Sequence, residues 1–274
     1  MKVNCVLIEE DMRDDFEDVF PKELDLSMTR VAVGAVDERD YILGAVSYQV
    51  VNYEYHIDWL YVEPEYRRRG IGTFLIDQVL RAVMQTGEIL PVTARFELSD
   101  ENMDLYNFFL SSQNMDLSYS HERYYVSFEN LRSSEILHRS INSKLKMVSF
   151  FNKPLIEQKK ILNRLSKEET YTVTNYDAWK KDCVPELCQC VYVNNNLVDL
   201  IFMKELPDGN LELSFLYGKY PRGLMELIYD IISKIEMTYP GAFLTFEAIS
   251  EEARNLAQNL FPSARTVPVY EAEF

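Results

Sequence analysis

Arg67-Arg68-Arg69-Gly70-Ile71-Gly72-Thr73 is the stretch that decides the fold of the first half of this 274-residue chain. It stands between an alternating apolar segment, residues 55–62, and a segment with apolar residues at helical spacing, residues 72–85. This order predicts a strand, a loop and a helix. Glycines let the backbone approach a ligand closely, and the amides at the start of a helix point outward. The loop is therefore predicted to bind an anion.

The three arginines of this loop lie in a strongly acidic part of the chain. The formal net charge is −16, and residues 1–130 contain 11 Lys and Arg against 25 Asp and Glu. Clustered arginines in such surroundings favour anion binding over a role in solubility. Several successive amide donors suit the pyrophosphate of a nucleotide-derived cofactor. The third glycine of a Rossmann fingerprint and the Gly-Lys-Ser/Thr ending of a P-loop are missing, so neither of these motifs is present.

The remainder of the first half supplies further strands and helices. Periodicity predicts strands at 3–9, 30–36, 41–51, 55–62, 90–98 and 124–128, and helices at 11–24, 72–85 and 100–112. The turn-like run Asp37-Glu38-Arg39-Asp40 joins the second and third strands into a hairpin.

The second half repeats the later part of the first. It has predicted strands at 189–193, 197–205, 210–217, 242–248 and 266–272, and helices at 223–239 and 251–261, after a connection with a short helix at 133–140. Phe215-Leu216-Tyr217 before a helix parallels Trp59-Leu60-Tyr61 before the first one. We therefore predict an internal duplication with two domains, residues 1–128 and residues 129–274.

The sequence from Leu60-Tyr61-Val62 through Pro64 to Arg67-Arg68-Arg69-Gly70-Ile71-Gly72 resembles the (Arg/Gln)-x-x-Gly-x-Gly signature of the GNAT superfamily of N-acetyltransferases. The element order also resembles theirs over residues 1–128. The resemblance implies an α/β (α+β) fold with a mixed central sheet of the GNAT acyl-CoA N-acyltransferase type, in two tandem domains. Departures occur at Ser99, where family members often have Asn, and at Asn114-Met115, which replace the customary Gly-Phe.

The resemblance also implies acetyl-CoA as the cosubstrate. Its pyrophosphate would be bound by the loop residues Arg67, Arg68, Arg69, Gly70, Ile71, Gly72 and Thr73, and its pantetheine arm by the backbone of Tyr61 and Val62 and by Ser99. Tyr106, seven residues after Ser99, would lie near the thioester sulfur and act as general acid to the departing thiolate. The alternative is that Tyr106 packs in the core beside Leu105, Phe108 and Phe109.

A general base is needed because an amine is mostly protonated at neutral pH. Alternate residues of a strand share a face, so His56, Asp58, Leu60 and Val62 are expected to point the same way. His56 lies where some family members have a catalytic carboxylate, and its ordinary pKa suits proton transfer. His56 and Asp58 are the candidate bases, and both could instead be wall residues of the cleft.

The second half lacks an equivalent loop. It has only Gly218-Lys219-Tyr220-Pro221-Arg222 between strand and helix, which is shorter and places a proline where an amide donor would be needed. We therefore expect a degenerate, non-catalytic GNAT-like domain that shapes the acceptor cleft of the first.

The function predicted is transfer of an acetyl group to a primary amine by direct attack on the thioester. The alternative is a non-catalytic acyl-CoA-binding or regulatory module. Acidic residues 11–25 indicate a cationic acceptor, either a small molecule or a peptide amine, although they could be only a solvated face.

Composition limits the other partners. The acidic charge argues against nucleic acid, which needs an extended basic surface. No apolar run is long enough to cross a membrane, and no signal peptide is evident, so we expect a cytoplasmic protein. Its four cysteines lack the paired spacing of a zinc site, and no metal is expected. The oligomeric state cannot be read from these residues.

Overall fold

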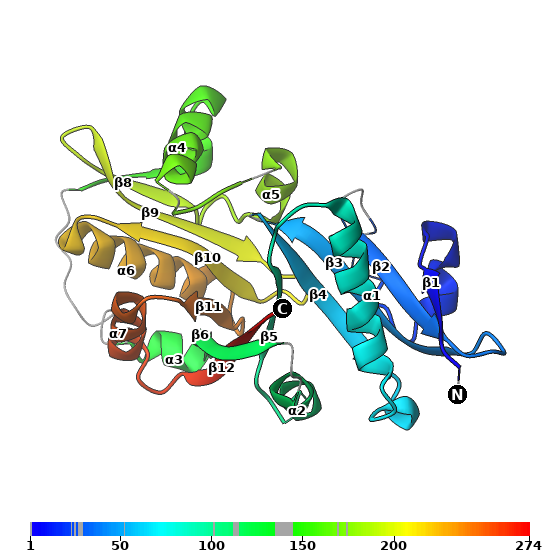
Figure 1. The fold of residues 1–274 in the computed structure, drawn as a ribbon. Coiled ribbons are helices and arrows are strands. Elements are labelled where there is room, and N and C mark those ends of the chain that lie inside the picture. The colour runs from blue at the N-terminus through cyan, green and yellow to red at the C-terminus, as the bar shows by residue number, and fades with distance from the viewer. Residues whose placement is uncertain are drawn as a thin grey trace. The chain divides into compact units, whose positions relative to one another are not determined.

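The computed structural model describes residues 2–22, 24, 26, 30–51, 53–100, 102–111, 115–134, 145–168, 170–173 and 175–274. The chain divides into two compact units. Unit 1 comprises residues 1–120 and 269–274, and unit 2 comprises residues 121–268. Each unit combines strands of a β-sheet with helices, as labelled in Figure 1.

Unit 1 has a mixed sheet with one long helix across it. Its elements are β1 (Asn4–Leu7), the 3-10 helix η1 (Glu10–Phe16), β2 (Arg30–Val36), β3 (Ile42–Val51), β4 (Glu54–Val62), the 3-10 helix η2 (Pro64–Tyr66), α1 (Ile71–Thr86), β5 (Val92–Glu97), α2 (Met103–Ser111), the start of β6 (Asp116–Val126) and the end of β12 (Arg265–Glu273). β1 to β4 pair antiparallel in chain order, and β5 lies parallel to β4. α1 packs Leu75, Ile76 and Val79 against this sheet (Figure 1).

The last residues of the chain belong to the sheet of unit 1. β12 pairs antiparallel with β5, from Val269 opposite Glu97 to Glu273 opposite Thr93. The compact units therefore differ from the predicted ranges 1–128 and 129–274, since 121–128 group with unit 2 and 269–274 with unit 1. As sequence domains, the predicted ranges remain a prediction.

The helix predicted at residues 11–24 is wrong in type and length. Only the 3-10 helix η1 forms there, and the chain then turns. The Arg13 guanidinium donates hydrogen bonds to the backbone carbonyls of Pro21, Lys22 and Leu24, and Pro21 cannot continue a helix. The apolar residues are nevertheless buried as the pattern requires, because Phe16, Val19 and Phe20 pack in a small cluster of their own.

The strand predicted at 124–128 is also displaced. β6 runs from Asp116 to Val126, and α3 (Phe128–Arg132) follows it directly. The Ser127 hydroxyl accepts a hydrogen bond from the Asn130 backbone N–H, which caps α3 and ends the strand. Of the short helix predicted at 133–140, residues 135–140 lie outside the described residues.

Unit 2 continues with β7 (Lys146–Ser149), the 3-10 helix η4 (Phe150–Asn152), α4 (Leu155–Lys167), α5 (Tyr176–Asp182), β8 (Gln189–Val193), β9 (Asn196–Glu205), β10 (Leu211–Gly218), α6 (Pro221–Thr238), β11 (Leu244–Ala248) and α7 (Glu251–Leu260). β7 to β10 pair antiparallel in chain order, β11 lies parallel to β10, and β6 pairs with β11. The core of this sheet includes the buried Leu227, Ile231 and Ile235 of α6. None of the described helices is both long enough and apolar enough to span a membrane.

The strand pairing of the two units shows the duplication directly. Pairing of β3 with β4 shifts by one residue at Asp58, between the pairs Ser47–Trp59 and Tyr48–Ile57. Pairing of β9 with β10 shifts in the same way between Leu213 and Phe215. The two bulges occupy equivalent positions, three residues before Tyr61 and three before Tyr217.

Candidate active site

The predicted anion loop has the backbone geometry that such a site requires. Arg68 and Gly70 adopt positive φ angles of 59° and 80°. Gly70 is the N-cap of α1, and its carbonyl accepts the first intrahelical bond, from the Phe74 N–H at 2.9 Å. The N–H groups of Ile71, Gly72 and Thr73 precede the Phe74–Gly70 bond, so they have no acceptor within the helix. They add to the partial positive charge of the helix end.

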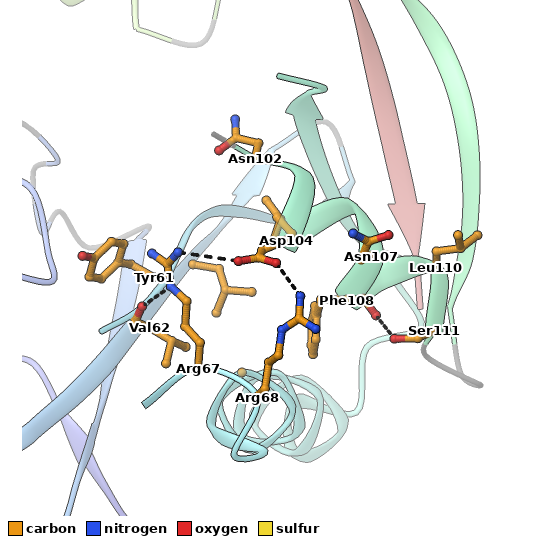
Figure 2. A pocket seen from close by; sticks show the side chains of 13 residues that line it. Tyr61, Val62, Arg67, Arg68, Asn102, Asp104, Asn107, Phe108, Leu110 and Ser111 are labelled. Carbon is orange, nitrogen blue, oxygen red and sulfur yellow. Dashed lines mark hydrogen bonds and ion pairs between the residues drawn. The ribbon is translucent and has the colours of Figure 1, made fainter. Parts of the chain in front are cut away.

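A cleft of about 870 Å³ opens beside this helix start. Its lining comes from β4 (Leu60, Tyr61, Val62), from the loop and α1 (Arg67, Arg68, Gly72) and from α2 with the residue before it (Asn102, Asp104, Leu105, Asn107, Phe108, Leu110, Ser111). Figure 2 shows the charged side chains gathered where α2 faces the start of α1. The cleft therefore extends from the predicted anion loop to the end of β4.

Two of the three arginines point into the cleft. The Arg67 Nε donates to the Val62 carbonyl at 2.9 Å, and the guanidinium lies 5.6 Å from the centre of the Tyr61 ring. The Arg68 Nη2 lies 2.8 Å from Asp104 Oδ1, and Asp104 Oδ2 lies 3.9 Å from Arg67 Nη1 (Figure 2). Arg69 stacks over Tyr66 instead, 5.5 Å from its ring centre. Arg67 and Arg68 are thus placed to contact an anion in the cleft.

The strands β4 and β5 separate next to this cleft. Their pairing runs from Tyr55–Val92 to Ile57–Ala94 and ends there, although β4 continues to Val62. Within the described residues, the last part of β4 has no further ladder partner on this edge. Arg67 Nε holds the Val62 carbonyl, and the other backbone groups on this edge are available to pair with an extended ligand in the way that a strand would. Tyr61 and Val62, the predicted partners of the pantetheine arm, lie on this stretch.

The bulge at Asp58 overturns the predicted alternation along β4. Tyr55, Ile57, Leu60 and Val62 all pack in the cluster that includes α1, whereas Trp59 and Tyr61 pack in the cluster around Phe16. The extra residue at the bulge shifts the side-chain alternation by one position. His56 and Asp58 therefore do not share a face with Leu60 and Val62, as a regular strand would require.

His56 is partly buried and has partners on β5. Its Nδ1 lies 3.2 Å from the Thr93 hydroxyl and 4.0 Å from Glu54 Oε1. Burial, followed by the nearby Arg95 guanidinium, lowers the pKa of His56, although Glu54 and other carboxylates oppose this. A lowered pKa keeps the imidazole neutral near pH 7, which is the form that can accept a proton.

Asp58 is held in a tight set of contacts. The Arg30 Nε donates to Asp58 Oδ2 at 2.7 Å, and the Ser47 hydroxyl donates to Oδ1. Arg30 and Asp58 side chains are only 14% and 13% exposed. Both carboxylate oxygens of Asp58 are therefore engaged by donors of the protein.

Tyr106 lies on α2 but is not among the residues that line the cleft. Its ring meets the ring of Tyr270 edge to face, with centres 5.0 Å apart, and the two hydroxyls are hydrogen-bonded. Tyr270 belongs to the C-terminal strand β12, so a residue far along the chain contacts the candidate acid. No local pattern predicts this contact, because it depends on the pairing of β12 with β5.

Ser99 lies in the turn before α2, and its carbonyl accepts a hydrogen bond from the Asn102 N–H at 3.1 Å. Asn102 rather than Ser99 lines the cleft, and its side-chain amide donates to the Glu97 carbonyl at 3.2 Å. The cleft residues that sequence reasoning missed are Asn102, Asp104, Asn107, Leu110 and Ser111. In the part of the chain that the structure describes, no group of three or more His, Cys, Asp or Glu is placed to hold a metal ion.

Comparison with known proteins gives a family match for the first part of the chain. Residues 5–110 match the acetyltransferase (GNAT) family. No curated protein sequence is similar enough to this chain to count as a match.

Solved structures share the fold over the whole chain. A glucosamine N-acetyltransferase region of a fungal multi-domain GH3 β-N-acetylglucosaminidase superposes with a TM-score of 0.70 at 13% identity, covering 100% of this chain and 38% of that protein. A tandem GNAT protein from the clavulanic acid biosynthesis pathway has a TM-score of 0.66 at 10% identity, covering 99% of this chain and 98% of that one. A GCN5-related N-acetyltransferase from Kribbella flavida has a TM-score of 0.57 at 13% identity, covering 98% and 70%.

These similarities confirm the predicted fold, a mixed α/β architecture of the tandem GNAT type. Residues 5–110, which make up most of unit 1, are thus similar to the acetyltransferase (GNAT) family.

Proposed function

We propose that unit 1 is an acetyl-CoA-dependent N-acetyltransferase that transfers the acetyl group to a primary amine by direct attack on the thioester. The observation that carries this proposal is the coincidence of three features at one cleft. The start of α1 offers backbone amides, Arg67 and Arg68 add positive charge, and the last part of β4 has a free edge. Together they suit a ligand with a pyrophosphate at one end and an extended amide-containing arm at the other.

The residues present fit acetyl-CoA. The amides of the loop from Arg67 to Thr73 would hold the pyrophosphate, Tyr61 and Val62 would pair with the pantetheine arm, and Asn102 is better placed than Ser99 to contact that arm. When bound, acetyl-CoA supplies an activated acetyl thioester. The contribution of the protein is then to bind and orient the reactants, with no covalent step on a side chain.

Two side chains are proposed to move protons. His56, with its lowered pKa, accepts a proton from the incoming ammonium, directly or through a water molecule. Asp58 is the second candidate, and its carboxylate is already held by Arg30 and Ser47. Tyr106 donates a proton to the departing thiolate, and its contact with Tyr270 fixes the orientation of the ring.

The proposed acceptor is an amine on a small molecule or a peptide. The acidic η1 segment, with Glu10, Asp11, Asp14 and Asp15, favours a cationic acceptor over an anionic one. The glucosamine N-acetyltransferase region named above acts on an amino sugar, and an amino sugar is one member of this proposed class.

A second candidate function is acyl-CoA binding without turnover. Two observations favour it: Tyr106 does not line the cleft, and Asp58 is engaged by Arg30 and Ser47. In that case the cleft would hold acyl-CoA and the protein would act as a regulatory module.

The deciding experiment measures free CoA thiol released from saturating acetyl-CoA in the presence of a panel of amines, including polyamines, amino sugars and lysine peptides. Release that depends on an amine, with the acetylated amine detected by mass spectrometry, supports the enzyme. Tight acetyl-CoA binding by calorimetry with no amine-dependent release across the panel would support the binding module.

A further inference from the structure

The duplication allows each position around the first loop to be matched in unit 2. In unit 1, Gly44 of β3 lies opposite Val62, the last residue of β4. In unit 2, Asp199 of β9 lies opposite Gly218, the last residue of β10. Asp199 is therefore the counterpart of Gly44.

Backbone bonds just after the two strands support this match. The Glu63 N–H donates to the Leu43 carbonyl at 3.0 Å in unit 1. The Lys219 N–H donates to the Val198 carbonyl at 2.9 Å in unit 2. Each bond joins the residue after one strand to the residue before the matched Gly or Asp, so the two units use the same local pairing.

The Asp199 carboxylate is completely buried, at 0% exposure. Its Oδ1 accepts hydrogen bonds from the Lys219 N–H at 3.0 Å and the Tyr220 N–H at 2.9 Å. For Oδ2, the described residues provide no hydrogen-bond partner. Burial raises the pKa of Asp199, and the two amides oppose that rise. Burying a charged carboxylate costs folding free energy unless its surroundings favour the negative charge.

The start of α6 supplies these surroundings. Tyr220 is the N-cap of this helix, which extends from Pro221 to Thr238. A Cβ atom added at Gly223, in the first turn, would lie 2.2 Å from Asp199 Oδ2. The carboxylate thus sits against the first turn of a long helix, where backbone N–H groups and the helix dipole favour an anion.

Unit 1 differs at this point. A Cβ atom added at Gly44 would lie 2.4 Å from the Tyr61 carbonyl oxygen, so no side chain can stand there. The start of α1 instead borders the open cleft, which Gly72 helps to line. The start of α1 in unit 1 faces a cleft, whereas a carboxylate of the protein itself lies against the start of α6 in unit 2.

We infer that Asp199 is a built-in anion that fills the second unit's counterpart of the anion site and closes it to phosphate-bearing ligands. The helix start of unit 2 is then closed to a ligand, unlike its counterpart in unit 1, and the chain binds a single acyl-CoA. The statement about acyl-CoA rests on the proposed function, whereas the role of Asp199 does not.

The test is chemical rescue of Asp199→Gly with acetate. This variant removes a group close to acetate in size and leaves the Lys219 and Tyr220 amides facing the space. We expect a lower melting temperature than the wild type. Acetate at about ten times its Kd should raise that temperature by about 3–6 °C relative to chloride of the same ionic strength.

The controls are the wild type and Asp208→Gly, which removes an exposed carboxylate that accepts the Asn210 N–H in a turn. Neither should respond to acetate. A folded Asp199→Gly protein with no specific acetate response would overturn the inference. If that variant does not fold, Asp199→Asn decides, because the amide keeps the shape without the charge. A melting temperature of Asp199→Asn equal to or above that of the wild type would then overturn the inference.

A titration with CoA tests the stoichiometry. We expect one site per wild-type chain, and one site of roughly tenfold or more lower affinity when Arg67 and Arg68 are both replaced by Glu. A second CoA site in the wild-type chain or in this double variant would show that unit 2 is open. A wild-type chain that binds no CoA would refute the proposed function, while the acetate rescue would still report on Asp199.

Discussion

Asp104 Oδ1 on α2 lies 2.8 Å from Arg68 Nη2 on the loop before α1, so a carboxylate of the protein contacts a guanidinium in the candidate cofactor cleft. Both side chains are substantially exposed, at 53% and 81%, and the pair is therefore weak. A cofactor phosphate would compete with this carboxylate for the same guanidinium.

Asp104→Asn should therefore tighten acetyl-CoA binding, by about 3- to 10-fold, because it removes a competing and repelling negative charge. Calorimetry at low and moderate salt provides the measurement, and the gain should shrink as salt rises. Asp77→Asn, on the exposed side of α1, is the matched control and should change the affinity little. Unchanged or weaker binding by Asp104→Asn would mean that Asp104 orients the arginines and does not compete with the ligand.

The loop itself should govern cofactor affinity. Replacing Arg67 and Arg68, the two arginines that line the cleft, together with Glu should weaken acetyl-CoA binding by roughly tenfold or more, through lost anion contacts. Calorimetry on variants shown to be folded by circular dichroism is the measurement. An affinity equal to that of the wild type would remove the basis of the assignment.

Gly72 lines the cleft, so substitutions there test whether acetyl-CoA occupies the space beside it. A Cβ atom here would meet the Phe108 ring at 3.5 Å, an ordinary contact, so Gly72→Ala should bind acetyl-CoA nearly as the wild type does. Gly72→Trp should fill the cleft and weaken binding by roughly tenfold or more, because the ligand loses its approach to the amides of α1. Equal affinities of the Ala and Trp variants would place the cofactor elsewhere.

Tyr106→Phe separates proton transfer from packing. The substitution keeps the ring that meets Tyr270 and removes only the hydroxyl. If Tyr106 protonates the thiolate, turnover should fall roughly 10²- to 10⁴-fold while acetyl-CoA affinity is unchanged. Stability should drop by only about 1 kcal/mol, the value of one hydrogen bond. A variant with more than about half of the wild-type turnover would assign Tyr106 to packing.

The C-terminal strand should be required by the first unit. Deleting residues 269–274 removes the partner of β5 and the buried Ala272, so we expect loss of the cooperative unfolding of unit 1 and of acetyl-CoA binding. Glu273→Ser, at an exposed position of the same strand, is the control and should behave as the wild type. A truncated chain with unchanged acetyl-CoA affinity would contradict the role of β12 in unit 1.

Glu247 should make the free energy of unfolding of unit 2 depend on pH. Its hydrogen bond with His121 and its contact with Arg123 lower the pKa of Glu247 from 4.5 to about 2. A carboxyl whose pKa is lowered on folding stabilises the protein above its unfolded pKa and loses that effect as the pH falls towards its folded pKa. The stabilisation is thus present above about pH 4.5 and disappears towards pH 2.

Glu247→Gln should accordingly be less stable than the wild type at pH 7, by about 1–2 kcal/mol after allowance for its 36% exposure to solvent. The difference should vanish near pH 2. Urea denaturation followed across this range gives both values. A difference that stays constant between pH 7 and pH 2 would show that the ion pairs do not stabilise the fold.

Features that depend only on neighbouring residues could be predicted from the amino-acid sequence. The glycines and arginines of residues 67–73 predicted the anion loop before α1, because the start of a helix exposes amides whatever the rest of the chain does. The apolar spacing of residues 72–85 predicted α1 within one residue at each end. The repeated Phe215-Leu216-Tyr217 predicted the duplication.

Features that depend on pairing between distant segments became visible in the folded chain alone. The bulge at Asp58 reversed the faces of β4, since register arises from the partner strand and leaves no mark in the alternation itself. The contact between Tyr106 and Tyr270 exists because β12 returns to pair with β5. Asp199 reads as an ordinary strand residue in the sequence, and its place against the start of α6 follows from the packing of β9 beside β10.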